Sequence, residues 1–147
     1  MGAEQQKTLD AVAALVDAGR PFIMATVTEE GKPAMRWMGA LAMDENEPHV
    51  GYLVCGRNSR KMRQITANPA TQMLFSSEDF TCIATISGVC EIVDSQERKQ
   101  WAWDRIPGAE QYYNSPENPE FGVIRFAATR VEYISLAESH ETICIDL

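Results

Sequence analysis

The chain has 147 residues, a length typical of one domain, so we expect a single domain over residues 1–147. Its 45% hydrophobic and 23% charged residues are ordinary for a globular protein, which excludes a disordered or collagen-like chain. The net charge of −8 disfavours nucleic acids and anionic membranes as partners.

Targeting segments and metal sites are also not expected. The sequence has no run of roughly 18 apolar residues, so it predicts no transmembrane helix. The polar segment 1–7 lacks the apolar stretch of a signal peptide, and we expect a cytoplasmic protein. The four cysteines form no CxxC pair and the two histidines lie far apart, a pattern that does not favour a metal site.

The N-terminal half predicts one helix followed by strands. Apolar residues recur at helical spacing within 4–18, and Gly19 ends that helix. Strands are predicted over 22–28, 33–43 and 50–55, separated by polar turns. These three strands are expected to form a meander of antiparallel hairpins.

The second half predicts two further helices and three strands. A helix is expected over 60–67, with Asn58 or Ser59 as its N-cap. Asp94 and Glu97 resemble a capping box for a helix that runs to about Arg105. The predicted strands are 71–76, 81–93 and 123–136; residues 107–119 are expected to form a proline-bearing loop, and the residues after 136 a tail.

Together these elements predict a mainly β fold with a few short helices. Six strands in meander order favour a small antiparallel β-barrel. The periodicity of the strands does not distinguish a closed barrel from a sandwich.

Positive charge is concentrated in one short window of this acidic chain. No Asp or Glu occurs from Pro48 to Ser77, whereas Arg57, Arg60, Lys61 and Arg63 lie within seven residues. Such a patch attracts a small anion while the overall negative charge repels polyanions. Because these residues stand at the start of a predicted helix, whose first N–H groups are unpaired, they form a candidate phosphate site. The alternative is a solvated basic helix face.

Several motifs in order resemble the pyridoxamine 5′-phosphate oxidase-related flavoproteins, within them the branch of general stress protein 26. The resemblance rests on Gly-Tyr-Leu-Val-Cys at 51–55, Asn-Ser-Arg-Lys at 58–61, Gln64-Ile65, Asn68-Pro69, Gly31-Lys32-Pro33, Arg36-Trp37-Met38 and the glycine-bearing run 86–94. It covers roughly residues 22–103, with 123–135 as the family's last strand.

The resemblance implies a six-stranded split β-barrel that forms a homodimer and binds FMN at the subunit interface. It further implies which residues bind the cofactor. The FMN phosphate would be held by Arg36, Ser59, Arg60 and Lys61, and Gln64 belongs to the same motif. The isoalloxazine ring would lie along the backbone of Trp37-Met38 and Val54-Cys55.

Two departures set this chain apart from the oxidases proper. Cys55 stands where the family commonly has Thr, so one hydroxyl contact is lost or weakened. The C-terminal region lacks the Arg-x-His clamp that binds substrate in those oxidases. We therefore do not expect oxidation of pyridoxamine phosphate.

The expected chemistry is flavin-dependent oxidation and reduction, with NAD(P)H as donor and a small molecule as acceptor. The cofactor carries such chemistry, and the sequence offers no acid or base residue for a catalytic role. Tyr112-Tyr113 in the proline-bearing loop are either a gate over a pocket or packed aromatics. The alternatives are a non-catalytic flavin-binding or stress protein, the same barrel binding deazaflavin F420 or haem, and a structural dimer with no ligand.

Overall fold

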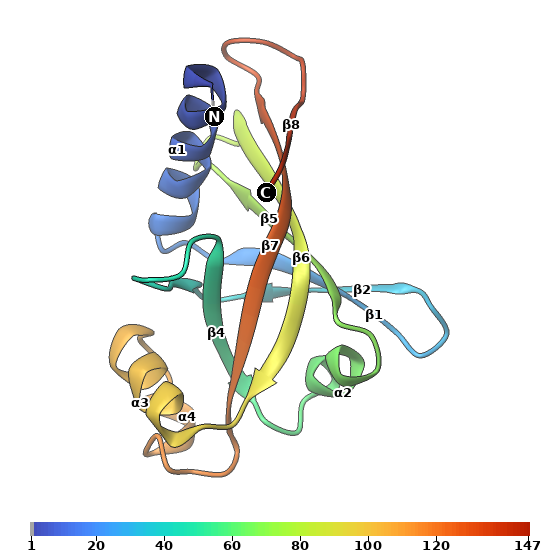
Figure 1. Ribbon diagram of the computed structural model, residues 1–147. Helices are drawn as coiled ribbons and strands as arrows, with labels where there is room; N and C mark the ends of the chain where they lie inside the picture. The colour runs from blue at the N-terminus through green and yellow to red at the C-terminus, as the bar shows by residue number, and fades with distance from the viewer. Residues whose placement is uncertain (1) are drawn as a thin grey trace.

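The computed structural model describes residues 2–147 and has the mainly antiparallel β architecture expected (Figure 1). The helices are α1 (Ala3–Asp17), α2 (Arg60–Ala67), α3 (Gln96–Arg105) and α4 (Glu110–Tyr113). The strands are β1 (Phe22–Val27), β2 (Pro33–Met38), β3 (Ala42–Met43), β4 (Val50–Gly56), β5 (Ala70–Ser76), β6 (Cys82–Val93), β7 (Phe121–Ser135) and β8 (Ile143–Asp146). Between Gly2 and Leu147, no helix has the length and apolar character needed to span a bilayer.

The sheet is a barrel that is split between β2 and β3. Its strand order is β2-β1-β5-β6-β7-β4-β3, so two strands that follow each other in the chain lie at its two ends. The single strand predicted over 33–43 is therefore wrong, because β2 pairs with β1 whereas β3 pairs with β4. Residues 39–41 cross from one edge to the other and join them covalently.

The predicted meander is only partly right: β1–β2 and β3–β4 form antiparallel hairpins, and β5, β6 and β7 pair in chain order. Two other pairings depart from it. β4 pairs with β7, and β1 pairs with β5 as well as β2. The connection through α2 carries the chain away from β4, which leaves the neighbouring position to β7 (Figure 1). Alternating apolar residues determine which face of a strand is buried, but they do not determine which strand lies beside it.

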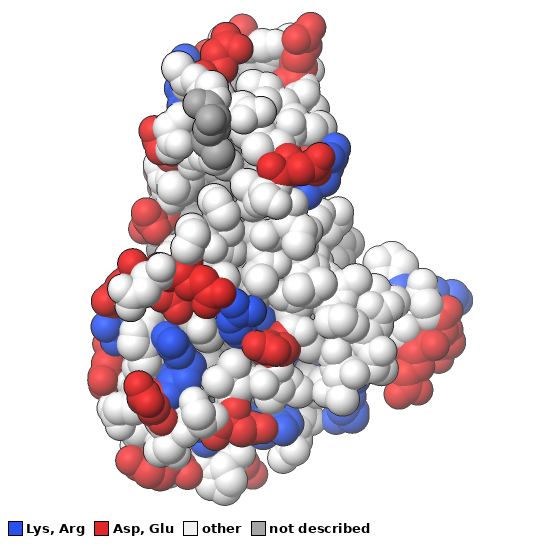
Figure 2. Space-filling view, viewed as in Figure 1, with Lys and Arg blue, Asp and Glu red and all other residues white. Residues whose placement is uncertain are grey.

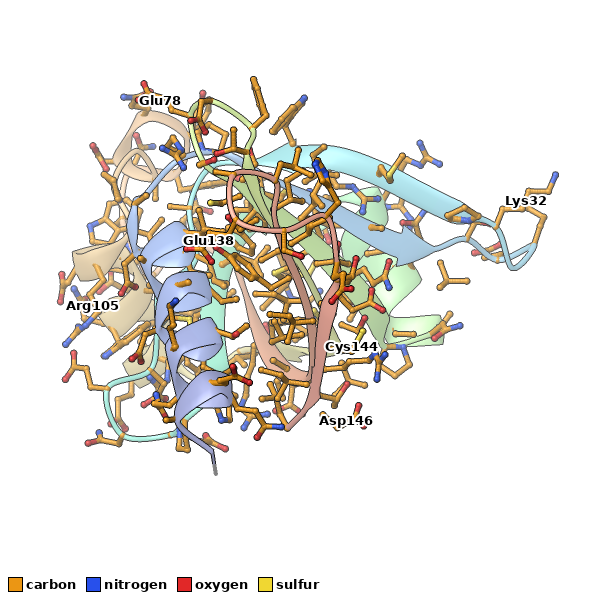
Figure 3. The ribbon with its side chains drawn as sticks, turned by 90° about the horizontal axis from the view of Figure 1, so that it is seen from above. Lys32, Glu78, Arg105, Glu138, Cys144 and Asp146 are labelled. Carbon is orange, nitrogen blue, oxygen red and sulfur yellow. The ribbon has the colours of Figure 1, made fainter. Side chains whose placement is uncertain are left out.

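The C-terminal residues form a strand rather than the expected tail. β8 pairs with the end of β7, with Val131 opposite Ile145. The Arg130 guanidinium bonds the Asp146 carboxylate at 2.9 Å beside this pairing. Figure 3 shows Cys144 and Asp146 on this strand, at the edge of the molecule. The structure thus has eight strands where six were predicted, from the division of 33–43 and the addition of β8.

Two apolar clusters lie on opposite faces of β4. Leu53 and Cys55 face the barrel interior, where they join a core that includes residues of β1, β5, β6, α1 and α2. Tyr52 and Val54 face the second cluster, which packs against α3 and the loop before β7. Residues of β4 therefore connect the barrel interior with the α3 and α4 side.

Gly122 on β7 allows α2 to lie close to the sheet. A Cβ atom there would be 2.5 Å from Cε of Met62 and 2.9 Å from the carbonyl oxygen of Cys55. Met62 is fully buried, so it has little room to move away. A residue without a side chain is needed where the first turn of α2 packs on β7.

The N-cap of α3 is Ser95 and not the predicted Asp94. The Ser95 hydroxyl accepts a hydrogen bond from the Arg98 N–H at 3.3 Å. Asp94 instead accepts two hydrogen bonds from Arg57, at 2.9 and 3.1 Å. The loop predicted over 107–119 also contains the short helix α4.

Candidate anion and cofactor site

Three polar residues from three elements meet at one end of the barrel. Nη1 of Arg36 donates to Oγ1 of Thr26 at 2.8 Å, and Nη2 donates to Oε1 of Gln64 at 3.0 Å. The Thr26 hydroxyl also donates to Oε1 of Gln64, at 2.5 Å. Thr26 and Gln64 are buried and Arg36 is half-buried. These contacts fix the Arg36 side chain against the body of α2.

The charge of Arg36 is held in an unfavourable environment. Burial lowers the pKa of its guanidinium, and the positive charge of Arg60 lowers it further. No carboxylate lies within 4 Å of the Arg36 guanidinium among residues 2–147. An anion bound between Arg36 and Arg60 would relieve this repulsion.

The first turn of α2 lies beside this cluster and is open to a ligand. Ser59 is the N-cap, one of the two positions predicted, but its hydroxyl does not cap the helix. That hydroxyl instead lies 3.8 Å from the sulfur of Cys55. Backbone bonding from the start of the helix begins with the Arg63 N–H donating to the Ser59 carbonyl, at 3.4 Å. The Ser59 N–H donates to the Gly56 carbonyl at 3.1 Å, so the free donors of this helix N-terminus are the N–H groups of residues 60–62.

The side chains of Arg60 and Lys61 have no partner within the part of the chain that the structure describes. Neither forms a hydrogen bond or an ion pair with residues 2–147. The other two cations of the cluster are engaged: Arg57 pairs with Asp94, and Arg63 donates to the Asn58 carbonyl at 2.8 Å. Of the four cations singled out in the sequence, two are thus available to an anion.

Cations elsewhere on the surface are mostly paired. Figure 2 shows acidic and basic side chains interleaved over α3, at the lower left of the view. There Arg98 pairs with Asp44 at 3.6 Å, and Arg105 pairs with Glu45 at 2.7 Å. Lys7 and Lys32 also have no side-chain partner among residues 2–147, so Arg60 and Lys61 differ from other free cations in their position, at the start of α2 and beside the half-buried Arg36.

A cleft of about 210 Å³ lies between α2 and the β1–β2 hairpin. Arg60, Arg63 and Gln64 line one wall, and Glu29 and Glu30 lie on the hairpin side. Figure 3 shows the hairpin reaching away from the body of the molecule, with Lys32 near its tip. The cleft is open, and its basic wall is the α2 side.

Cys55 is another buried residue of the site. Burial raises the pKa of its thiol, while Lys61 and Arg36 act in the opposite direction. The thiol therefore stays protonated near neutral pH, in spite of the cations near it. Its position brings β4 into the same site as β2 and α2.

The structure brings six of the nine predicted cofactor-binding residues together: Arg36, Cys55, Ser59, Arg60, Lys61 and Gln64. The other three are predicted to contact the ring through their backbone, and their side chains lie outside this cluster. Trp37 is 68% exposed on the opposite face of β2. Met38 packs against the barrel core, and Val54 packs against the second cluster.

Sequence reasoning missed Thr26, although the sequence contains a signal for it. Thr26 follows Phe22 and Met24 at alternate positions of β1, all three buried. A polar residue in the buried register of a strand needs a partner, and Arg36 and Gln64 are those partners here.

Two tryptophans of α3 lie outside this site. Trp101 packs against Tyr52, and Trp103 packs against Phe121.

A comparison with protein families decides the family. The model described as pyridoxamine 5′-phosphate oxidase matches residues 8–135. The chain belongs to this family. The match spans β1 to β7, and it confirms the resemblance drawn from the motifs. No curated protein gave a match.

Solved structures show the same fold. A Clostridium acetobutylicum protein related to general stress protein 26 of B. subtilis has a TM-score of 0.80 at 19% identity, with 97% of this chain and 96% of that chain covered. General stress protein 26 from Bacillus anthracis has a TM-score of 0.73 at 19% identity, with 92% and 97% covered. A pyridoxamine 5′-phosphate oxidase-related, FMN binding protein from Nostoc punctiforme has a TM-score of 0.65 at 15% identity, with 94% and 95% covered.

Proposed function

We propose that this protein is a flavoprotein that binds FMN with the residues gathered at the start of α2. The observation that carries the proposal is the pair of unpartnered cations, Arg60 and Lys61, beside the half-buried Arg36. Membership of the family and the FMN-binding relative from Nostoc punctiforme support it.

The residues present fit a phosphate monoester. Such a group carries up to two negative charges and several acceptor oxygens. Donors that complement this group come from the free N–H groups in the first turn of α2 and from the Ser59 hydroxyl, which does not cap the helix. Positive charge comes from Arg36, Arg60 and Lys61. Gln64 holds Arg36 in place, and its amide oxygen is already used by Arg36 and Thr26. We therefore assign Gln64 a positioning role.

The ring of the cofactor would lie along β2 and β4, where it would contact the backbone of Trp37-Met38 and of Val54-Cys55. When bound, FMN supplies hydride and electron transfer. The chain's own part is to bind and orient it and to keep water from one face. We propose NAD(P)H as the donor and a small molecule as the acceptor of this reaction.

We further propose that two copies of the chain form the complete site. An apolar row crosses the outer face of β2, β1 and β5: Trp37 lies opposite Ile23, which lies opposite Leu74. Met35 and Trp37 on the edge strand are 72% and 68% exposed. Exposed apolar surface of this kind favours association, and here it lies on the strand that carries Arg36.

Absorption spectroscopy of the purified protein tests the proposal. After incubation with FMN and removal of the excess, we expect flavin bands that stay with the protein. NAD(P)H added under anaerobic conditions should then bleach those bands if the protein is an oxidoreductase. Retained flavin without bleaching would favour a flavin carrier or store. If protein purified from its native source shows the absorption bands of F420 or haem, that molecule and not FMN is the cofactor.

A further inference from the structure

A cavity of about 440 Å³ lies between α1 and the barrel. Residues of α1 form one wall, and residues of β6, β7 and the segment between β2 and β4 form the other. Figure 1 shows α1 at the other end of the molecule from α3 and α4. This cavity shares no residue with the cleft at α2, and none of the nine predicted cofactor-binding residues lines it. A ligand bound here would therefore be separate from the proposed flavin.

The floor of the cavity is apolar. Ile86 of β6 and Phe126 and Val131 of β7 line it, and all three are buried members of the barrel core. Leu41 also lines the cavity and packs closely over Gly51, where a Cβ atom would be 2.9 Å from its Cγ. These side chains are held by the core around them, so the cavity offers a preformed apolar surface to a ligand.

The wall formed by α1 follows from the residue spacing of the helix. Val12 and Val16 are buried in the barrel core and hold α1 against the sheet. Residues 6, 9, 10, 13 and 17 line the cavity from an adjacent strip of the helix surface, at spacings of three and four. Ala13 stands in the middle of that strip and is exposed. Its single methyl group leaves open the space that a longer side chain would fill.

The rim of the cavity is acidic. Asp10 and Asp17 lie two helical turns apart, on either side of Ala13, and both are exposed. Asp10 accepts a hydrogen bond from Gln6 at 2.9 Å. Neither carboxylate forms an ion pair with residues 2–147. The only other titratable side chain of the wall in this part of the chain is that of His49, and no Lys or Arg lines it.

We propose that this cavity binds a small organic amine with an apolar body. The body lies on the floor formed by residues of β6 and β7, and the ammonium group reaches the carboxylate of Asp10 or Asp17 at the rim. An anion with the same body is repelled by these carboxylates. An ammonium group without an apolar body gains no more here than elsewhere on the acidic surface of this chain.

Titration of the full chain, labelled with nitrogen-15 and observed by NMR, tests the proposal. The probes are 4-phenylbutylamine, 4-phenylbutanol and 4-phenylbutyrate, which share one apolar body and carry a positive charge, no charge and a negative charge. The backbone amide signals of Ala13 and Ala128, which both line the cavity, should shift when the amine is added. Affinities are taken from these two signals, so that butyrate held by the cations of α2 is not counted.

The order of the three affinities reports the charge at the rim. We expect the amine to bind at least about threefold more tightly than the alcohol, because an exposed ion pair contributes modestly to affinity. The butyrate should bind most weakly. An amine that binds no more tightly than the alcohol or the butyrate would overturn the proposal, as would the absence of any shift at Ala13 and Ala128.

A pair of tryptophan variants locates the apolar body. Ala13→Trp fills the cavity from α1 and should weaken binding of the amine at least about tenfold, because the ligand loses the space above the floor. Ala14→Trp places the same ring on an exposed position of α1 outside the cavity wall, and binding should be unchanged. The amide spectra verify that both variants are folded. Binding that survives Ala13→Trp would contradict the location.

A second set of variants locates the ammonium group. With both Asp10→Asn and Asp17→Asn in one chain, the amine and the alcohol should bind alike. Glu4→Gln removes one charge from the same helix outside the cavity wall, so the preference for the amine should remain. A preference that persists in the double variant would refute the role of the rim. FMN is absent from all these titrations, so their results do not depend on the flavin function.

Discussion

Arg36 on β2 donates a hydrogen bond to Oε1 of Gln64 on α2 at 3.0 Å, and this bond links the barrel edge to the helix of the candidate site. The same amide oxygen accepts from the hydroxyl of Thr26 on β1 at 2.5 Å. A single buried acceptor thus serves donors from two strands. It holds in place a cation that burial and a neighbouring charge both destabilise.

Gln64→Leu is expected to lower the free energy of unfolding by about 1–3 kcal/mol, because it leaves the buried Thr26 hydroxyl and the Arg36 guanidinium without this acceptor. Urea denaturation measures the change. Gln72→Leu is the matched control, since Gln72 donates to Ser87 at an exposed position. There we expect a change within about 0.5 kcal/mol. Equal losses in the two variants would contradict the role of Gln64.

Arg60→Ala and Lys61→Ala should each weaken FMN binding by about 1–3 kcal/mol, as expected for a charge-assisted contact to phosphate. Fluorescence titration of FMN measures the affinity. Lys7→Ala on α1 removes the same charge far from the site and controls for the overall field. Unchanged affinity in both site variants would remove the phosphate assignment.

The α2 site could largely be predicted from the sequence because its residues are local. Ser59, Arg60 and Lys61 are consecutive at a helix start, and the free N–H groups follow from helix geometry. The partners of the cluster could not all be predicted in this way. Asp94 lies 37 residues from Arg57, and its pairing with Arg57 leaves the capping of α3 to Ser95.

Strand neighbours were the least predictable part of the fold. The alternation along β4 indicates two buried faces, but nothing in it indicates that β7 is the partner. The split of 33–43 has the same origin, since β2 and β3 follow different partners. Residues of β8 carry a weak apolar signal, and pairing with β7 stabilises them as a strand.

Trp37→Glu is expected to raise the dissociation constant of the proposed homodimer by at least about tenfold, because a large exposed aromatic is a typical interface anchor. Sedimentation velocity over a range of protein concentrations measures it. Ile143→Glu on β8 places the same charge on another exposed apolar strand residue, and the dimer should persist. A wild-type protein that is monomeric at micromolar concentration while it binds FMN tightly would contradict the shared site.

Because of Cys90, the free energy of unfolding is expected to vary with pH in the alkaline range. Burial raises the pKa of its thiol from 9.0 to about 11 in the folded protein. Between these values the unfolded chain loses the thiol proton while the folded chain keeps it, so stability falls as the pH rises. Relative to Cys90→Ala, the wild-type protein should lose about 2 kcal/mol of stability from pH 9 to pH 11.

Urea denaturation of both proteins across this pH range measures the difference. The comparison cancels groups that titrate in the same range in both proteins, such as Tyr133, whose pKa is raised to about 12. A constant difference in stability between the two proteins would show that the Cys90 thiol titrates alike in the folded and unfolded chains.

Retention of FMN by the purified protein tests the central claim most directly. The apoprotein is mixed with FMN, passed over a desalting column and examined by absorption spectroscopy, alongside the double variant Arg60→Ala/Lys61→Ala. We predict flavin bands in the wild-type protein and their loss in the variant. A colourless wild-type protein, or a variant that retains as much FMN as the wild type, would contradict the account.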